Sequence, residues 1–355
     1  MPLLPEEDNK NETRPEIIMT TGTKIFRIII SILLALTMLW SALLGIIVIA
    51  GIRELVLTDE YKISVAGVPV TNLNKHDILG DGTVYYDVHN NVLTLDNAEI
   101  ESVYPAVYSA VDLNIELVGE NRLVCNNEGY SIGVYAGDSN LGKELAFIGD
   151  GSLTVELSKK SEQAAGIFAS HLTIYTDISV TTSDCENMAN GLVCENSLLI
   201  VDNARVTVNN GAAKYSSGVR VRGDAFLEGG TALNVFVNSG SNEACKGFSI
   251  NGDLYLGKDS SLEVHIGDEN AESSECIRVT GLMEIEKGAV VTASAKNTHA
   301  VACYGTVKAN KGAVVCAESE STAADIFCSG AVINYGAEIN AEIDAVAGIR
   351  NNAEG

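Results

Sequence analysis

Short runs of alternating apolar and polar residues recur along most of the chain, and the word "KGAVV" occurs twice, at 287–291 and 311–315. Alternate residues of a β-strand point to one face, so each run predicts a strand with a single apolar face. The first run of each unit starts at an apolar residue that usually follows glycine or a small residue. These starting residues recur every 23 to 33 residues and are Val107, Val134, Ile167, Leu192, Val219, Phe248, Ile277, Val301, Ile326 and Ile349.

Two further alternating runs complete each unit, with a tight turn between them. The turns include "GDGS" at 149–152 and "EGGT" at 228–231, which are rich in residues that tolerate turn dihedrals. Three strands per unit, with apolar positions matched from unit to unit, predict an all-β fold, a parallel β-helix of about ten coils. The apolar pairs of the third run include Ile178 with Val180, Val206 with Val208, and Val314 with Cys316.

An uncharged stretch of 25 residues, Ile28 to Ile52, precedes the repeats. At about 1.5 Å per residue a helix of this length spans a bilayer core of roughly 30 Å. More basic residues precede it than follow it closely, which places the N-terminus in the cytoplasm and the repeats outside the cell. A cleaved signal peptide, with a cleavage site near Val48 to Ala50, is the alternative. Its apolar region would be only about 7 to 15 residues long, so the sequence favours an uncleaved anchor.

Residues 61–100 differ from the later units and contain "YDVHNNVLTL", which predicts a hairpin with Asn90 and Asn91 in its turn. This segment is the predicted cap over the first coil. At the other end "AGIRNNAEG" begins a further coil without a recognisable cap, which predicts either packing against a protein partner or a frayed last coil. The predicted organisation is a cytoplasmic tail at 1–24, a transmembrane signal-anchor helix at 25–52, a linker at 53–60, the β cap at 61–100 and the parallel β-helix at 101–355.

Residues near the start of the repeats also carry a resemblance. "VAGVPVTNLNKHDILGDGTVYYDVHNNVLTLDNAEI", followed by "LNIELVGENRLV" and "IGDGSLTVEL", resembles secreted or anchored bacterial surface proteins described as right-handed β-helices and often labelled carbohydrate-binding. The resemblance implies a right-handed coil, a location at the cell surface and a glycan ligand. It supplies no catalytic residues.

Eight cysteines in an extracellular domain would ordinarily form disulfides, but the repeat places most of them in the core. Cys185 falls in a loop and is predicted to be exposed. Cys303 and Cys328 lie on adjacent coils, at a separation of about 4.8 Å that a disulfide could bridge. Because the repeat places most of the cysteines in the core, we predict that they are mostly free thiols. The predicted inward positions are those of Cys125, Cys194, Cys245, Cys303, Cys316 and Cys328.

Composition argues against two classes of function. A net charge of −24 argues against a nucleic-acid-binding surface. Pectin hydrolases built on β-helices carry Asp-Asp and Gly-His-Gly motifs, and neither occurs in this chain, so a non-catalytic protein is favoured. A polysaccharide lyase or hydrolase remains an alternative, because sites assembled from several coils escape motif analysis. The five histidines fall at unrelated points of the repeat and are His76, His89, His171, His265 and His299.

No cofactor is predicted, and no cysteine or histidine spacing indicates zinc. Calcium is the one alternative that the loops offer, although they contain no EF-hand spacing. The loop carboxylates that could serve it are Asp138, Asp184, Glu186, Asp268 and Glu269.

The outward residue of each first strand forms a column that is a candidate binding face. Aromatic rings offer flat surfaces to sugars, and arginine offers a planar pair of donors to carboxylates. The alternative is that these are ordinary outward residues covered by loops. The leading hypothesis is a membrane-anchored extracellular protein that binds polysaccharide or acts as an adhesin, with a structural stalk or assembly subunit as the runner-up. The predicted ligand-binding residues are Tyr135, Phe168, Arg220 and Arg278.

Overall fold

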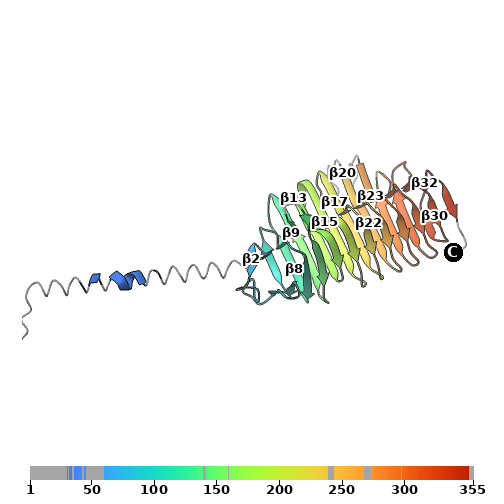
Figure 1. Cartoon of the computed structure of the whole chain (residues 1–355). Coiled ribbons are helices and arrows are strands. Elements are labelled where there is room, and N and C mark those ends of the chain that lie inside the picture. The colour runs from blue at the N-terminus through green and yellow to red at the C-terminus, as the bar shows by residue number, and fades with distance from the viewer. Residues whose placement is uncertain are drawn as a thin grey trace, which may run out of the picture. The chain divides into compact units, whose positions relative to one another are not determined.

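The computed structural model forms two compact units, Met1–Thr58 and Asp59–Gly355, and all of its strands lie in the second (Figure 1). Among the described residues no helix is long and apolar enough to cross a membrane. Most of the predicted anchor and the whole of the predicted tail lie outside the described part of the chain. The structure describes residues 30, 32–33, 36–41, 44, 60–138, 141–158, 160–238, 244–267, 273–296 and 298–351.

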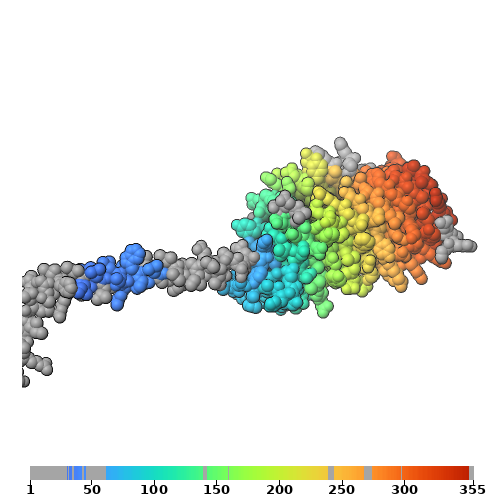
Figure 2. All heavy atoms as spheres, viewed as in Figure 1, coloured from blue at the N-terminus to red at the C-terminus, as the bar shows by residue number. Residues whose placement is uncertain are grey.

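The second unit is a parallel β-solenoid of about eight turns. This is somewhat fewer than the ten coils predicted from the repeat. Successive turns stack in chain order and appear as successive bands of colour in the space-filling view (Figure 2). Each turn contributes three strands, and strands at equivalent positions pair in parallel, in three ladders.

The first ladder consists of β6 (Val107–Ser109), β9 (Tyr130–Asp138), the start of β13 (Ser161–Ile174), the start of β15 (Cys185–Ile200), β17 (Tyr215–Val221), β20 (Ala244–Ile250), β23 (Ser273–Val279), β26 (Val301–Cys303), β29 (Ile326–Cys328) and β32 (Ile343–Ala345).

The second ladder consists of β4 (Val92–Asp96), β7 (Leu113–Val118), β11 (Glu144–Ile148), the ends of β13 and β15, β18 (Ala225–Leu227), β21 (Leu254–Leu256), β24 (Met283–Ile285), β27 (Val307–Ala309), β30 (Val332–Asn334) and β33 (Ile349–Asn351).

The third ladder is a separate sheet of ten strands. They are β5 (Glu99–Ser102), β8 (Glu120–Cys125), β12 (Ser152–Leu157), β14 (Asp177–Thr182), β16 (Arg205–Asn210), β19 (Ala232–Asn238), β22 (Ser261–Gly267), β25 (Val290–Ala295), β28 (Val314–Ser319) and β31 (Glu338–Asn340).

The predicted inward column of the first ladder is confirmed from Val107 to Ile326, where register joins each residue to the next and all are buried. Burial of each such side chain is worth roughly 1.5 to 3 kcal/mol, so the stacked columns stabilise coils that would not fold singly. The predicted last member, Ile349, is wrong. Ile343 follows Ile326, whereas Ile349 stacks on Val332 in the second ladder, because this last unit is shorter than those before it.

The two "KGAVV" words do occupy the same place on neighbouring coils, since Val290 pairs with Val314 and Val291 with Val315. The prediction that Val314 and Cys316 face the core is wrong, because the inward positions lie one residue away. Val315 is buried, whereas Val314 and Cys316 are partly exposed on the outer side. Alternation is regular in this coil, with Ala313, Val315 and Ala317 buried, so the second valine of the pair points into the core.

The N-terminal end of the solenoid is covered by antiparallel strands. β1 (Glu60–Val65) pairs with β2 (Val68–Thr71) and with β6, and β3 (Val84–Asp87) forms the expected hairpin with β4. Asn91 in its turn adopts a φ of 54°, a conformation that asparagine tolerates better than most residues. Parallel stacking already begins at Val92, inside the segment assigned to the cap, because β4 stacks on β7 and β5 on β8.

Glycines on the inner side of the first ladder let the first and third ladders approach closely. A Cβ added at any of them would overlap a valine methyl of the third ladder and crowd a main-chain carbonyl of the next coil. At the equivalent place in the following coil stands Cys276, whose Sγ donates to the Val264 carbonyl at 3.0 Å. The glycines concerned are Gly133, Gly166, Gly191, Gly218 and Gly247, and we call them the glycine column.

All eight cysteines are free thiols, and seven are buried. Cys303 and Cys328 pair in register on neighbouring coils without a disulfide. The predicted exposure of Cys185 is wrong: it is 6% exposed, because it begins β15 and pairs with Ser161 of the preceding coil. Burial raises the pKa of the Cys125 thiol to about 11 and that of Cys276 to about 12, which keeps both protonated and unreactive.

Candidate functional site

The four residues predicted to bind a ligand do lie in one outward column. Strand register joins Tyr135 to Phe168, and then through Val193 to Arg220 and through Ser249 to Arg278. The column runs across the first ladder from β9 to β23, on the side facing away from the core. The environment changes along the column, and it differs between the aromatic residues, Arg278 and Arg220.

The aromatic part is a stack of rings. The Tyr108 and Tyr135 rings are 5.8 Å apart at an interplanar angle of 1°, and Phe168 continues the stack 4.9 Å from Tyr135 at 12°. Tyr135 therefore has a neighbouring ring on both of its faces. Burial, followed by the nearby Tyr108, raises the pKa of the Tyr135 hydroxyl. These rings stabilise adjacent coils through one another, and the ring faces of Tyr135 are already occupied.

Arg278 is fully engaged by its neighbours. Its Nη1 donates to both carboxylate oxygens of Glu275 at 2.8 Å, and its guanidinium lies 4.5 Å from the centre of the Tyr304 ring. The Tyr304 hydroxyl also donates to Glu275 at 2.8 Å. A ligand carboxylate would have to compete with Glu275 for this arginine.

Arg220 instead lines a cavity of about 360 Å³ on the outer side of β15, β17 and β20. We call it the Arg220 cavity. Its wall is mixed: Met188, Tyr215 and Ala244 contribute apolar surface, and the other lining residues are polar or charged. The polar lining residues are Asn190, Ser216, Ser217, Arg220, Arg222, Lys246, Ser249 and Asn251.

A break in strand alternation builds this cavity. Val219 and Val221 are buried on the inner side, and Gly218 lies beside Val219 against the core, so Ser217 and Arg220 both line the outer cavity. The same break places two outward columns side by side. The column that the sequence analysis missed is in register and contains Asn190, Ser217, Lys246 and Glu275. The sequence does carry a signal for this column. Each of its residues immediately precedes a glycine of the glycine column or, in the last of these coils, Cys276.

The cavity also contains unsatisfied donors. Ser217 is 9% exposed, and neither its Oγ nor Arg220 Nε has a hydrogen-bond partner among the described residues. Buried polar groups are nearly always hydrogen-bonded, and leaving one unpaired costs about 1 to 3 kcal/mol. Both residues line the cavity, where an acceptor from outside the chain would satisfy them.

Charge pairing sets Arg220 apart from the other two cations of the cavity. Arg222 Nη1 lies 2.6 Å from a Glu195 carboxylate oxygen, and Lys246 Nζ lies 3.9 Å from Glu275. No carboxylate among the described residues pairs with Arg220. The cavity therefore carries an uncompensated positive charge within a chain whose net charge is −24.

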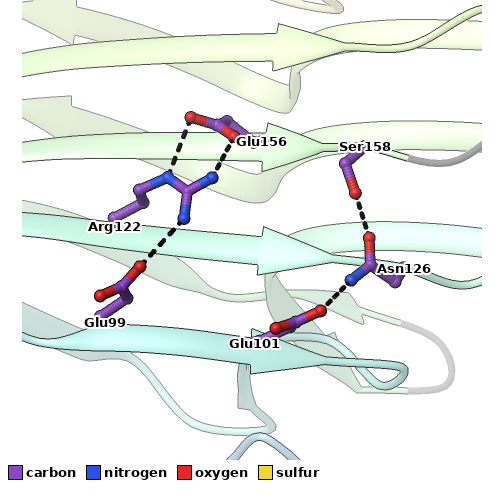
Figure 3. A network of polar contacts seen from close by, with 6 residues as sticks. All are labelled: Glu99, Glu101, Arg122, Asn126, Glu156 and Ser158. Atoms are coloured by element: carbon purple, nitrogen blue, oxygen red, sulfur yellow. Dashed lines mark hydrogen bonds and ion pairs between the residues drawn. The ribbon is translucent and has the colours of Figure 1, made fainter.

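The outer side of the third ladder looks different, because its charges satisfy one another. Arg122 on β8 donates to Glu156 on β12 at 3.1 and 2.7 Å and to Glu99 on β5 at 3.1 Å, so one guanidinium joins three coils (Figure 3). Asn126 donates to Glu101 at 2.6 Å in the same way and accepts a hydrogen bond from Ser158 (Figure 3). This surface is a structural network without free donors at these positions.

One of the histidines lies close to a serine hydroxyl. His171 Nδ1 lies 2.7 Å from Ser197 Oγ, the distance expected of a base beside a nucleophile. However, the Asn196 amide nitrogen lies 3.3 Å from Nε2 and can only donate to it, which leaves the proton on Nδ1. In this arrangement His171 donates to Ser197 and does not act as its base.

A metal site finds no support in the described residues, where no group of three or more histidine, cysteine or carboxylate side chains could hold an ion. Asp184, one of the candidate calcium ligands, accepts a hydrogen bond from the Ala212 amide at 2.8 Å. Asp268 and Glu269 lie outside the described residues.

No protein-family model matches the chain, and neither a curated protein nor a solved structure matches it significantly. The functional assignment therefore rests on the chemistry of the Arg220 cavity.

Proposed function

We propose that the protein is anchored in the cell membrane by residues 28–52, displays a right-handed β-solenoid outside the cell and binds an acidic polysaccharide there without catalysis. The observation that carries the ligand class is Arg220, a cation at a cavity wall that has no carboxylate partner in the described part of the chain. Right-handed winding is the rule for parallel strands joined by crossovers in one sheet. A stacked solenoid presents a long, regular surface, which suits an extended polymer.

An acidic ligand is favoured over a neutral one for two reasons. The ring faces of Tyr135 are covered by Tyr108 and Phe168, so they offer no free platform for a neutral sugar. Arg220 instead offers charged donors, and hydrogen bonds to a charged group are roughly twice as strong as neutral ones.

The test is a binding panel of acidic and neutral polysaccharides with the full chain in mild detergent. We expect acidic polymers to bind, and Arg220→Ala to weaken that binding at least about tenfold, the loss of one charged hydrogen bond. Arg278→Ala is the matched control, because it removes the same side chain from the same column where Glu275 already neutralises it.

Three outcomes would contradict the proposal. Binding that EDTA abolishes would point to a bound cation in place of Arg220. Release of reducing ends or unsaturated products would favour the polysaccharide-degrading alternative. Absence of binding to every glycan, together with self-association at rising concentration, would favour a structural subunit.

A further inference from the structure

The donors and acceptors of the Arg220 cavity narrow the chemical group that it recognises. We infer that the cavity binds the carboxylate of a single uronic acid residue of the polysaccharide, with Arg220 and Ser217 as its donors. This inference rests on the proposed glycan-binding function and adds the identity of the recognised group.

Donor count favours a carboxylate. Arginine presents a planar fork that matches a carboxylate with two parallel hydrogen bonds. Ser217 adds one O–H donor beside it, so two carboxylate oxygens receive about three hydrogen bonds. A sulfate or phosphate group has three terminal oxygens, whereas the fork of Arg220 matches two. Arg220 is the cation of this cavity that has no carboxylate partner among the described residues.

The rest of the wall suits a sugar ring. Asn190, Ser249 and Asn251 present groups that both donate and accept, as sugar hydroxyls do. Met188 supplies an apolar patch for the carbon-bound hydrogens of a ring. A volume of about 360 Å³ lies near the lower end of the roughly 300 to 1,000 Å³ typical of ligand pockets, so the cavity holds about one sugar residue rather than a long segment.

Matched polymers test the recognised group directly. Binding of the full chain in mild detergent would be measured for polygalacturonate and a glucuronate-containing polymer, each beside its carboxyl-reduced form, and for dextran sulfate and a phosphorylated mannan. We expect at least one polyuronate to bind, its carboxyl-reduced form to bind at least about tenfold more weakly, and the sulfated and phosphorylated polymers to bind more weakly than the polyuronate.

Variants then test the geometry. Arg220→Lys keeps the charge but loses the fork, and we expect it to weaken polyuronate binding about tenfold to a hundredfold. Ser217→Ala removes one neutral hydroxyl and is expected to weaken binding by several-fold. Arg205→Ala removes an exposed arginine from β16 of the third ladder and is expected to leave binding unchanged. The thermal unfolding midpoint of each variant shows whether it has folded as the unmodified chain does.

Failure of the inference is distinguishable from failure of the proposed function. Equal binding of a polyuronate and its carboxyl-reduced form, tighter binding of sulfated or phosphorylated polymers, or an unchanged Arg220→Lys variant would each overturn carboxylate recognition. Glycan binding itself would still stand in those cases. Absence of binding to every polymer would overturn both.

Discussion

Three arginines on the outside of the solenoid show how the surroundings of a residue decide its role. Arg122 joins three coils through Glu99 and Glu156, and Arg278 is held by Glu275 against an aromatic ring. Arg220 has no such partner among the described residues and lines a cavity. The same side chain therefore serves as a structural bridge in two places and as a candidate ligand contact in the third.

The bridge at Arg122 has a measurable pH dependence. Its hydrogen bonds hold the pKa of Glu156 below its ordinary value of 4.5. A carboxylate with a depressed pKa contributes stability that is fully present above its unfolded pKa and is lost as the pH falls through the folded value. We therefore expect Arg122→Ala to lower the thermal unfolding midpoint slightly at about pH 7, and the difference from the unmodified chain to shrink below pH 4.5.

Arg205→Ala serves as the control for this prediction as well, since it removes an outward arginine of the same ladder. High salt is expected to reduce the effect of Arg122→Ala, because the ion pairs are solvent-accessible. An effect of Arg122→Ala that grows at acid pH would show that the Glu156 pair does not form.

At the scale of elements, the ladders depend on shapes as much as on hydrophobicity. The glycine column has no room for a side chain, because the third ladder packs directly against it. None of its five glycines has a positive φ, so the requirement is for space and not for an unusual backbone conformation. The break in alternation at Gly218 also sets Ser217 and Arg220 side by side, which links this packing to the cavity.

Gly218→Ala tests that link. The added methyl would meet the Val235 side chain and approach the Gly247 carbonyl oxygen to 2.8 Å, so the two ladders must separate locally. We expect the free energy of unfolding to fall by about 1 to 3 kcal/mol, measured by urea denaturation, as overpacked cores do. Polyuronate binding is expected to weaken in the same variant at temperatures where it remains folded.

Gly267→Ala is the matched substitution, since a methyl at that position meets no atom within 4 Å. It is expected to change stability by no more than about 0.5 kcal/mol. Equal losses for the two variants would mean that the close approach of the ladders at Gly218 is not required.

At the scale of the whole molecule, stacking explains which features could be predicted from sequence. Inward residues repeat because each coil packs on copies of itself, so period-two alternation predicted the solenoid and most of its register. The error at Ile349 arose because its unit is short, and that at Cys316 because two adjacent valines offer two possible inward registers. The error at Cys185 arose because a strand extends into the predicted loop. The Arg220 cavity could not be predicted from the sequence for a different reason. Arg220 and Arg278 are equivalent in the repeat, and only their three-dimensional neighbours distinguish them.

The predicted membrane anchor is the remaining feature on which the proposed location depends. If residues 28–52 span the bilayer uncleaved, the full chain is expected to sediment with membranes and to stay there after high-salt and alkaline carbonate washes. Deleting 1–52 is expected to release a solenoid that still binds the same polymers, because the described hydrophobic core begins at Ile63. The intact mass distinguishes the alternative, since signal-peptide cleavage after Ala50 would remove the first 50 residues.

Protease added to intact cells is expected to degrade the solenoid while sparing the N-terminal tail, as the excess of basic residues before the apolar stretch requires. A full-length chain recovered in the soluble cell fraction, or a solenoid protected in intact cells, would remove the basis for an extracellular ligand.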